Sequence, residues 1–129
     1  MFPMMVKKWM HAGLDCIILK HDKMGHLCGY VGVPQHHPDY AKDYDDVDVQ
    51  VHGGLTFAAQ GGLPTCKLPK KTTKWFGFDC AHAGDKIPNM SAVQPNGHLW
   101  TVEEVINETK RLAEQLAGRA KVGKVKHGK

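Results

Sequence analysis

Two short runs of mostly apolar residues near the start of the chain predict a β-hairpin. Residues 14–20 and residues 26–33 each have the length and the content of branched apolar side chains that are typical of strands. The polar residues between them end in Gly25, which can adopt the positive φ that a tight turn requires. Pro34 ends the second strand. The pattern therefore predicts two paired antiparallel strands in this region.

The clearest alternation of apolar and polar residues in the chain covers residues 46–52. Every second residue there is valine, and the residues between the valines are polar. Because side chains alternate between the two faces of a strand, we expect a strand with its valines in the core and His52 on the polar face. Extended chain is also expected over residues 55–58, after a pair of glycines, and an aromatic strand over residues 73–79.

An amphipathic pattern near the end of the chain predicts one helix. Thr101 and Glu104 have the spacing of a capping box, in which each side chain binds a free backbone N–H at the helix start. Gly118 is expected to end the helix. The apolar residues recur on one helical stripe, which consists of Val102, Val105, Ile106, Leu112 and Leu116.

Strands followed by a helix are typical of an α+β fold, and we expect a small, mostly antiparallel sheet of about four strands packed by one C-terminal helix. Residues 60–72 are rich in Gly, Pro and Lys and are expected to form an exposed loop. Residues 1–118 are expected to form a single domain. Residues 119–129, whose charged side chains are all basic, are expected to form a disordered tail.

The composition narrows the class of protein. The chain has 129 residues, of which 42% are hydrophobic and 23% are charged, as in many small globular domains. The longest apolar run, residues 16–19, is far shorter than a membrane span. The first ten residues lack the apolar segment and cleavage site of a secretory signal. We therefore expect a cytoplasmic protein with no membrane partner.

Cysteines and charges are distributed unevenly. Cys16, Cys28, Cys66 and Cys80 form no CxxC pair, so we expect free thiols in a reducing compartment. The net charge of +4 combines five aspartates within residues 39–48 with lysines at residues 67–74 and in the tail. A basic loop and tail can bind nucleic acid, although no aromatic residues for base stacking are interleaved in the tail.

The densest group of chemically active side chains follows the aromatic strand. Asp79, His82 and Asp85 are spaced by three residues, so a tight turn could bring them to one ion, and Cys80 lies among them. Each residue also has an ordinary structural explanation. The aspartates can cap a turn by accepting backbone N–H bonds, and Cys80 can be a small buried side chain.

Two further segments carry candidate binding residues. His52 is followed by Gly53 and Gly54, which could let a backbone N–H approach a phosphate or an oxyanion. A loop between two prolines carries His36, His37 and Tyr40 and is expected to form the lip of a pocket. A single histidine in such a place is more often a surface residue or a hydrogen-bonding residue.

Three chemistries suit these residues. His52, His82, Asp79 and Asp85 could hold Zn²⁺ or Mn²⁺, and a metal-bound water could attack a phosphate or carbonyl centre, with Asp79 or Asp85 as general base. Cys80 paired with a histidine could be a thiolate nucleophile, although nothing identifies an oxyanion hole. A metal-free pocket could bind a nucleotide without turning it over. No HExxH, P-loop or GxGxxG motif is present.

The order of motifs resembles a known family. The segments CGYVGVP from Cys28, HPDY from His37, VHGGLT from Val51 and WFGFDCAHAGD from Trp75 are similar to those of a small family of uncharacterised proteins from bacteriophages and bacteria. The resemblance covers roughly residues 28–85 and, more loosely, the last helix. It implies a phage or prophage context, hence the cytoplasm of the host cell, and no particular activity.

The leading hypothesis is a small phage-type protein with a His/Asp pocket that hydrolyses a phosphate-bearing or nucleotide-like small molecule with a divalent metal. Two alternatives stay open. One is a non-catalytic binding protein that sequesters a nucleotide or inhibits a host protein. The other is a nucleic-acid binder that uses the basic loop and tail. The sequence leaves open whether the chain is a monomer or a homo-oligomer.

Overall fold

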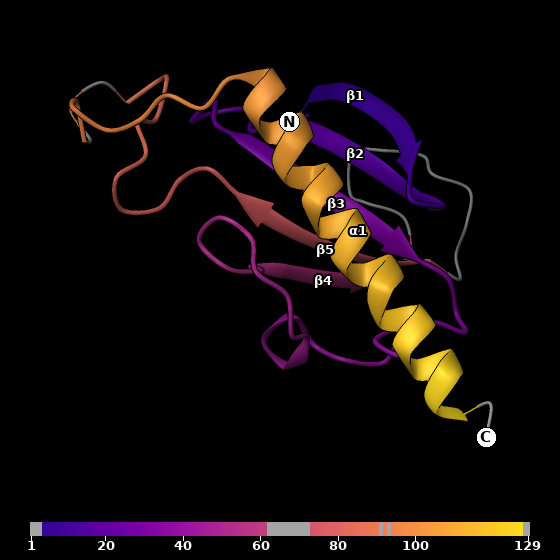
Figure 1. Cartoon of the computed structure of the whole chain (residues 1–129). Coiled ribbons are helices and arrows are strands. Elements are labelled where there is room, and N and C mark those ends of the chain that lie inside the picture. Colours follow the sequence, from indigo (N-terminus) through magenta and orange to yellow (C-terminus); the bar gives the residue numbers. More distant parts are fainter. Residues whose placement is uncertain (1–3, 62–72, 91, 93, 128–129) are drawn as a thin grey trace.

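The computed structural model describes residues 4–61, 73–90, 92 and 94–127. Five strands form one antiparallel sheet in the order β1-β2-β3-β5-β4, and the helix α1 crosses one face of it (Figure 1). The predicted α+β class is confirmed, with five strands in place of about four. The elements are β1 (Met4–His11), β2 (Leu14–Lys20), β3 (Leu27–Val33), β4 (Phe57–Gln60), β5 (Lys74–Asp79) and α1 (Val102–His127).

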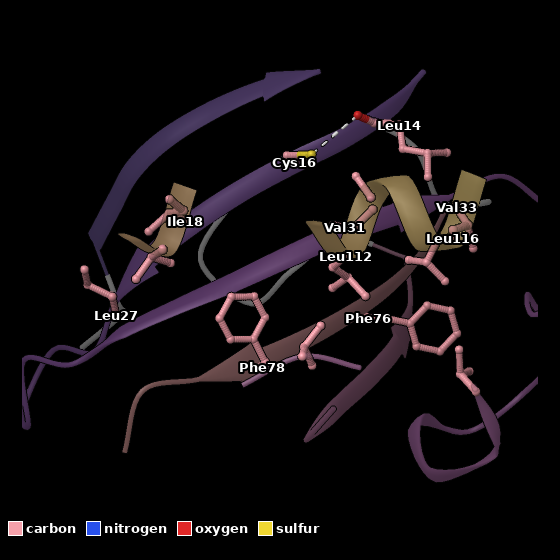
Figure 2. Close-up of a cluster of buried hydrophobic side chains, with 14 of the residues drawn as sticks. Leu14, Cys16, Ile18, Leu27, Val31, Val33, Phe76, Phe78, Leu112 and Leu116 are labelled. Atoms are coloured by element: carbon pink, nitrogen blue, oxygen red, sulfur yellow. Dashed lines mark hydrogen bonds between the residues drawn. The ribbon is translucent and has the colours of Figure 1, made fainter. Parts of the chain in front are cut away.

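The core lies between the sheet and α1. Figure 2 shows Phe76 and Phe78 of β5 pointing toward Leu112 and Leu116 of the helix, and all four side chains are almost completely buried. Val31 of β3 joins the same cluster. The opposite face of the sheet has a smaller buried cluster, formed by Ile17, Leu19 and Trp75.

The predicted hairpin is confirmed as β2 and β3, and the predicted aromatic strand as β5. The strand β1 was not predicted. Its sequence shows no alternation because it lies at an edge of the sheet, where most of its side chains are exposed. The capping box is also confirmed, since the Thr101 N–H donates to Glu104 Oε1 at 2.9 Å and the Glu104 N–H donates to Thr101 Oγ1 at 3.1 Å.

The predicted strand over residues 46–52 is wrong. A short 3₁₀ helix, η1 (Tyr44–Asp46), is followed by irregular chain, although Val47 and Val51 are buried as the alternation indicates. The backbone groups of this segment bond side chains of α1 in place of a neighbouring strand. The Gln50 N–H donates to Gln115 Oε1 at 2.7 Å, and the Gln50 carbonyl accepts from Arg111 Nη2 at 2.7 Å.

The expected helix end at Gly118 is also wrong, because α1 continues to His127. Arg119, which the sequence assigned to a disordered tail, pairs with the buried Asp39 and so holds this part of the helix against the loop after β3. The helix therefore continues across the boundary expected after residue 118, and the single domain over residues 1–118 stays a prediction. Within the described residues, no helix has the length and apolar content to span a membrane.

Candidate functional site

Three segments that are distant in sequence meet beside the first half of α1. They are the turn at residues 51–54, the loop after β5 at residues 80–85, and the segment at residues 98–101 that leads into the helix. The loop and the last segment are joined by a parallel bridge between Asp85 and His98. We call the side chains that converge here the His/Asp cluster, which consists of His52, Asp79, His82, Asp85 and Trp100.

Asp85 is the centre of the cluster, and its exposed fraction is only 2%. Its Oδ2 accepts hydrogen bonds from His52 Nε2 at 2.7 Å and from the His82 backbone N–H at 2.9 Å. Its Oδ1 accepts from the indole N–H of Trp100 at 3.0 Å. A buried carboxylate is costly unless it is hydrogen-bonded, and these three donors compensate it. Asp85 therefore connects the three segments and also orients the His52 ring.

The same contacts keep Asp85 ionised. Burial raises the pKa of this carboxyl, but the hydrogen bonds from His52 and from the His82 N–H, with the attraction of the imidazole, lower it by more, so the pKa lies below its usual range. An ionised acceptor opposite Nε2 of His52 keeps the proton on that nitrogen. In the neutral imidazole, Nδ1 is then the unprotonated nitrogen.

His52 is fixed by its neighbours yet remains partly exposed. Its backbone N–H donates to Glu108 Oε2 at 2.6 Å, and its ring lies against the Trp100 ring with centroids 4.4 Å apart. The side chain is 24% exposed. No hydrogen bond joins Nδ1 to any residue that the structure describes. The cluster thus presents one oriented imidazole with a free acceptor nitrogen.

A second histidine–aspartate pair lies beside the first. His82 Nε2 is 3.1 Å from Asp79 Oδ1, but the angle does not meet hydrogen-bond geometry, and this nitrogen is buried. Asp79 instead accepts hydrogen bonds from Thr56 Oγ1 and from the Ala81 N–H, both at 3.1 Å. The His52 and His82 rings meet edge to face with centroids 5.7 Å apart. The two imidazoles are therefore neighbours, and each is paired with its own carboxylate.

Gly53 makes this arrangement sterically feasible. Its φ is +69°, and a Cβ built on it would lie 2.2 Å from the His82 ring. Gly54 also has a positive φ, +78°, but a Cβ there would meet no atom within 4 Å. The first glycine is therefore required both for backbone conformation and for the packing of His82, whereas the second is required for conformation alone.

We expect Gly53→Ala to destabilise the fold by about 2–4 kcal/mol and to displace the His82 ring, because the methyl group adds a clash to the cost of positive φ. Gly54→Ala is the matched control and should cost about 1–2 kcal/mol. Chemical denaturation measures the free energy of unfolding, and imidazole ¹H–¹⁵N spectra report the ring. Equal costs for the two variants would contradict the predicted clash.

The predicted lip residues lie elsewhere. His37 is buried, and its Nε2 bonds the Leu116 carbonyl at 2.7 Å, while its Nδ1 accepts from the Asp39 N–H at 3.0 Å. Leu116 follows Glu108, which binds His52, by eight residues, or about 12 Å of helix. His37 therefore attaches its loop to the second half of α1.

The neighbours of His37 do not reach the cluster through any described contact either. His36 is exposed, and Tyr40 packs against the hydrophobic core. Residue type alone does not show which part of the fold this loop contacts. What decided the position of this loop is its hydrogen bonding to the far half of the helix.

Cys80 does not have the surroundings of a thiolate nucleophile. It is 2% exposed, and burial, followed by the nearby Asp85, raises the pKa of its thiol. Burial also raises the pKa of Cys28 to about 12. Cys16, Cys28 and Cys80 are free thiols, as expected. Cys66 lies outside the described residues, as do most of the basic loop at residues 67–74 and the exposed loop expected at residues 60–72.

The donor atoms of the cluster form pairs and do not converge. In the described part of the chain, no group of three or more His, Cys, Asp or Glu side chains is arranged to hold a metal ion. The Oδ2 atom of Asp85 is already bonded to His52 and to the His82 N–H. The predicted Zn²⁺ or Mn²⁺ site stays a prediction, without support from this arrangement.

Several residues of the site carry no signal that distinguishes them in the sequence. Trp100 resembles any aromatic residue before a helix cap, and Glu108 resembles a solvent-facing helix residue. Gln94 fastens the loop by donating from Nε2 to the carbonyls of His82 at 2.9 Å and Asp85 at 3.0 Å. Only the folded chain brings these partners to the histidines.

Comparisons of the chain with protein-family models, with curated proteins and with solved structures find no match. The site is therefore interpreted from its own geometry. What the geometry establishes is an α+β domain with an ionised, buried aspartate that orients a partly exposed histidine beside a second histidine–aspartate pair.

Proposed function

We propose that this protein is an acid–base enzyme that hydrolyses a phosphate-bearing or nucleotide-like small molecule, with His52 as general base. The observation that carries the proposal is the hydrogen bond of 2.7 Å between His52 Nε2 and the buried, ionised Asp85, which leaves Nδ1 without a described partner. A histidine that an aspartate holds in one tautomer is the arrangement of many general bases.

In the proposed reaction, His52 Nδ1 takes a proton from a water molecule as the water oxygen attacks phosphorus. Asp85 stabilises the imidazolium that forms, because an ionised carboxylate 2.7 Å from Nε2 attracts the positive charge. The ester P–O bond breaks, and the leaving oxygen needs a proton. His82, whose ring lies 5.7 Å from that of His52, is the proposed donor of that proton, from Nδ1, since its Nε2 is buried.

The presence of two adjacent imidazoles supports phosphoryl chemistry in particular. Displacement at phosphorus needs a base on the attacking side and an acid on the leaving side, and one histidine can supply each. The proposal needs no metal. The metal-dependent version would place Zn²⁺ or Mn²⁺ on His52, His82, Asp79 and Asp85, and these residues would first have to exchange their present hydrogen bonds.

Non-catalytic binding of a nucleotide is the second candidate. The observation that favours it is that the carboxylates of Asp79 and Asp85 already accept hydrogen bonds from backbone N–H groups and other side chains. Groups committed in this way suit a rigid binding site. This candidate predicts a ligand that is recovered unchanged after incubation.

We expect the purified protein to hydrolyse at least one of bis(p-nitrophenyl) phosphate, p-nitrophenyl phosphate and 2′,3′-cyclic AMP. His52→Gln should lower kcat about 10²- to 10⁴-fold, because it removes the general base. His36→Gln is the matched control, since His36 is an exposed histidine outside the cluster, and it should leave kcat unchanged.

Chelator and metal additions separate the versions of the proposal. Activity that persists in EDTA supports the metal-free mechanism, whereas activity that appears only with Zn²⁺ or Mn²⁺ contradicts it in favour of the metal-dependent version. Activity that is equal in His52→Gln and the unmodified protein would exclude His52 as the base. A tight ligand that is never turned over would favour the binding candidate.

A further inference from the structure

A groove of about 390 Å³ lies on the other side of α1, between the helix and the edge strand β1. Its lining consists of Lys7, Trp9, Glu103, Ile106, Asn107 and Lys110. None of these residues belongs to the His/Asp cluster. With about 100° of rotation per residue, Lys110 and the cluster's contact Glu108 point in nearly opposite directions from the helix axis. The buried core stripe of α1 therefore separates the two sites.

The charges in this groove are not balanced. Lys7 and Lys110 both line it, and neither forms an ion pair with a residue that the structure describes. Lys7 has only a cation–π contact, with its Nζ 5.7 Å from the centroid of the Trp9 ring. Glu103 is the single acidic residue in the lining. Two unpaired ammonium groups at one groove favour an anionic ligand.

The remaining lining residues indicate that the ligand also has an apolar part. Trp9 and Ile106 provide an apolar surface, and both pack against the hydrophobic core, so this surface is held in place. The indole N–H of Trp9 is buried and has no acceptor among the described residues. Because this nitrogen is shielded from solvent, Trp9 would contact a ligand in the groove through its ring and not through the N–H.

We propose that this groove is a second binding site, which takes a small molecule that combines a phosphate group with a flat apolar ring, such as a mononucleotide. The phosphate would lie between Lys7 and Lys110, and the ring against Trp9 and Ile106. The volume lies at the lower end of the range for small-molecule sites, about 300–1,000 Å³. This site does not depend on the function proposed for His52.

Isothermal titration calorimetry at low salt, with AMP, adenosine and ribose 5-phosphate as probes, tests this site. AMP should bind in the high-micromolar to millimolar range, and more tightly than either fragment, because only AMP offers both the phosphate and the ring. Lys7→Gln and Lys110→Gln should each weaken AMP binding about three- to fivefold, as expected for exposed charge pairs. Glu103→Gln should strengthen AMP binding, because it removes the one negative charge of the lining.

Two variants serve as controls. Lys8→Gln removes the same charge from the same strand, but Lys8 faces the opposite side of the sheet from Lys7 and Trp9, so AMP binding should not change. His52→Gln tests whether AMP binds at the His/Asp cluster, whose proposed substrate is also nucleotide-like. AMP binding that is lost in His52→Gln but unchanged in Lys7→Gln and Lys110→Gln would assign AMP to that cluster and overturn the proposal. Equal losses in Lys7→Gln and Lys8→Gln, or no AMP binding at roughly 10 mM, would overturn it as well.

Discussion

Replacing Asp85 by asparagine is expected to lower the stability of the fold by about 2–4 kcal/mol and to abolish any activity that depends on His52. The carboxylate accepts hydrogen bonds from His52 Nε2, the His82 N–H and the Trp100 indole N–H. An amide of the same shape has one acceptor oxygen and an NH₂ group. At least one of the three donors would then face another donor in a buried place.

The same change is also expected to move the proton of the neutral His52 ring from Nε2 to Nδ1. An NH₂ group opposite Nε2 favours the tautomer with the proton on Nδ1, which removes the base that the proposed mechanism needs. Chemical denaturation measures the loss of stability, and ¹⁵N spectra of the imidazole report which nitrogen carries the proton.

Asp79→Asn is the matched control for Asp85→Asn, because Asp79 belongs to the same cluster but its side chain is 28% exposed. Its unfolding free energy should fall by no more than about 1 kcal/mol, since solvent can replace a lost partner. If both variants lost the same stability, Asp85 would not be the residue that connects the three segments.

The second large effect is expected for Arg119→Gln, which should destabilise the fold by about 3–5 kcal/mol. Asp39 is completely buried, and it accepts from Arg119 Nε and Nη2, the latter at 2.8 Å, and from Lys42 Nζ at 2.9 Å. Without the guanidinium, a buried negative charge keeps only one cationic partner. Chemical denaturation of the variant measures the cost.

Arg111→Gln is the matched control. The Arg111 side chain is 53% exposed, so this substitution should lower the free energy of unfolding much less. A double-mutant cycle with Asp39→Asn should recover part of the loss in Arg119→Gln, because it removes the unpaired charge. Additive losses in the double variant would show that the two side chains do not depend on each other.

The same ion pair predicts the response to acid. Burial raises the pKa of Asp39, but the hydrogen bonds from Arg119 and Lys42 lower it by more, so it lies below the usual value. Stability from this group is therefore fully present above the unfolded-state pKa of about 3.9, and it is lost as the pH falls below that value through the folded-state pKa. Asp39→Asn should flatten this part of the stability curve.

The sequence determined the elements whose signals are local. The hairpin of β2 and β3 follows from two apolar runs around Gly25, and the start of α1 follows from the spacing of Thr101 and Glu104. The sequence also grouped Asp79, His82 and Asp85, because they follow one strand within seven residues, and the structure places them side by side. These features depend on residues close together in the chain.

The tertiary structure alone decided where the alternating segment at residues 46–52 finds its partners. Alternation indicated which side chains of the segment are buried, Val47 and Val51, but it does not show what completes the backbone hydrogen bonds. Here the side chains of Arg111 and Gln115 of α1 form the hydrogen bonds to the backbone of Gln50. Likewise, the continuation of α1 beyond Gly118 brings Arg119 to Asp39, a residue far away in the chain.

The same distinction holds for the site. The sequence identified His52, Asp79, His82 and Asp85 as a group, but residue spacing could not tell convergence on one ion from separate pairs. Two residues later in the chain decide between these arrangements. Trp100 fixes the orientation of Asp85, and Glu108 fixes the position of His52. Local patterns thus indicated the histidines and aspartates of this region. Long-range packing added Trp100 and Glu108 and determined which atoms face each other, because it joins segments far apart in the chain.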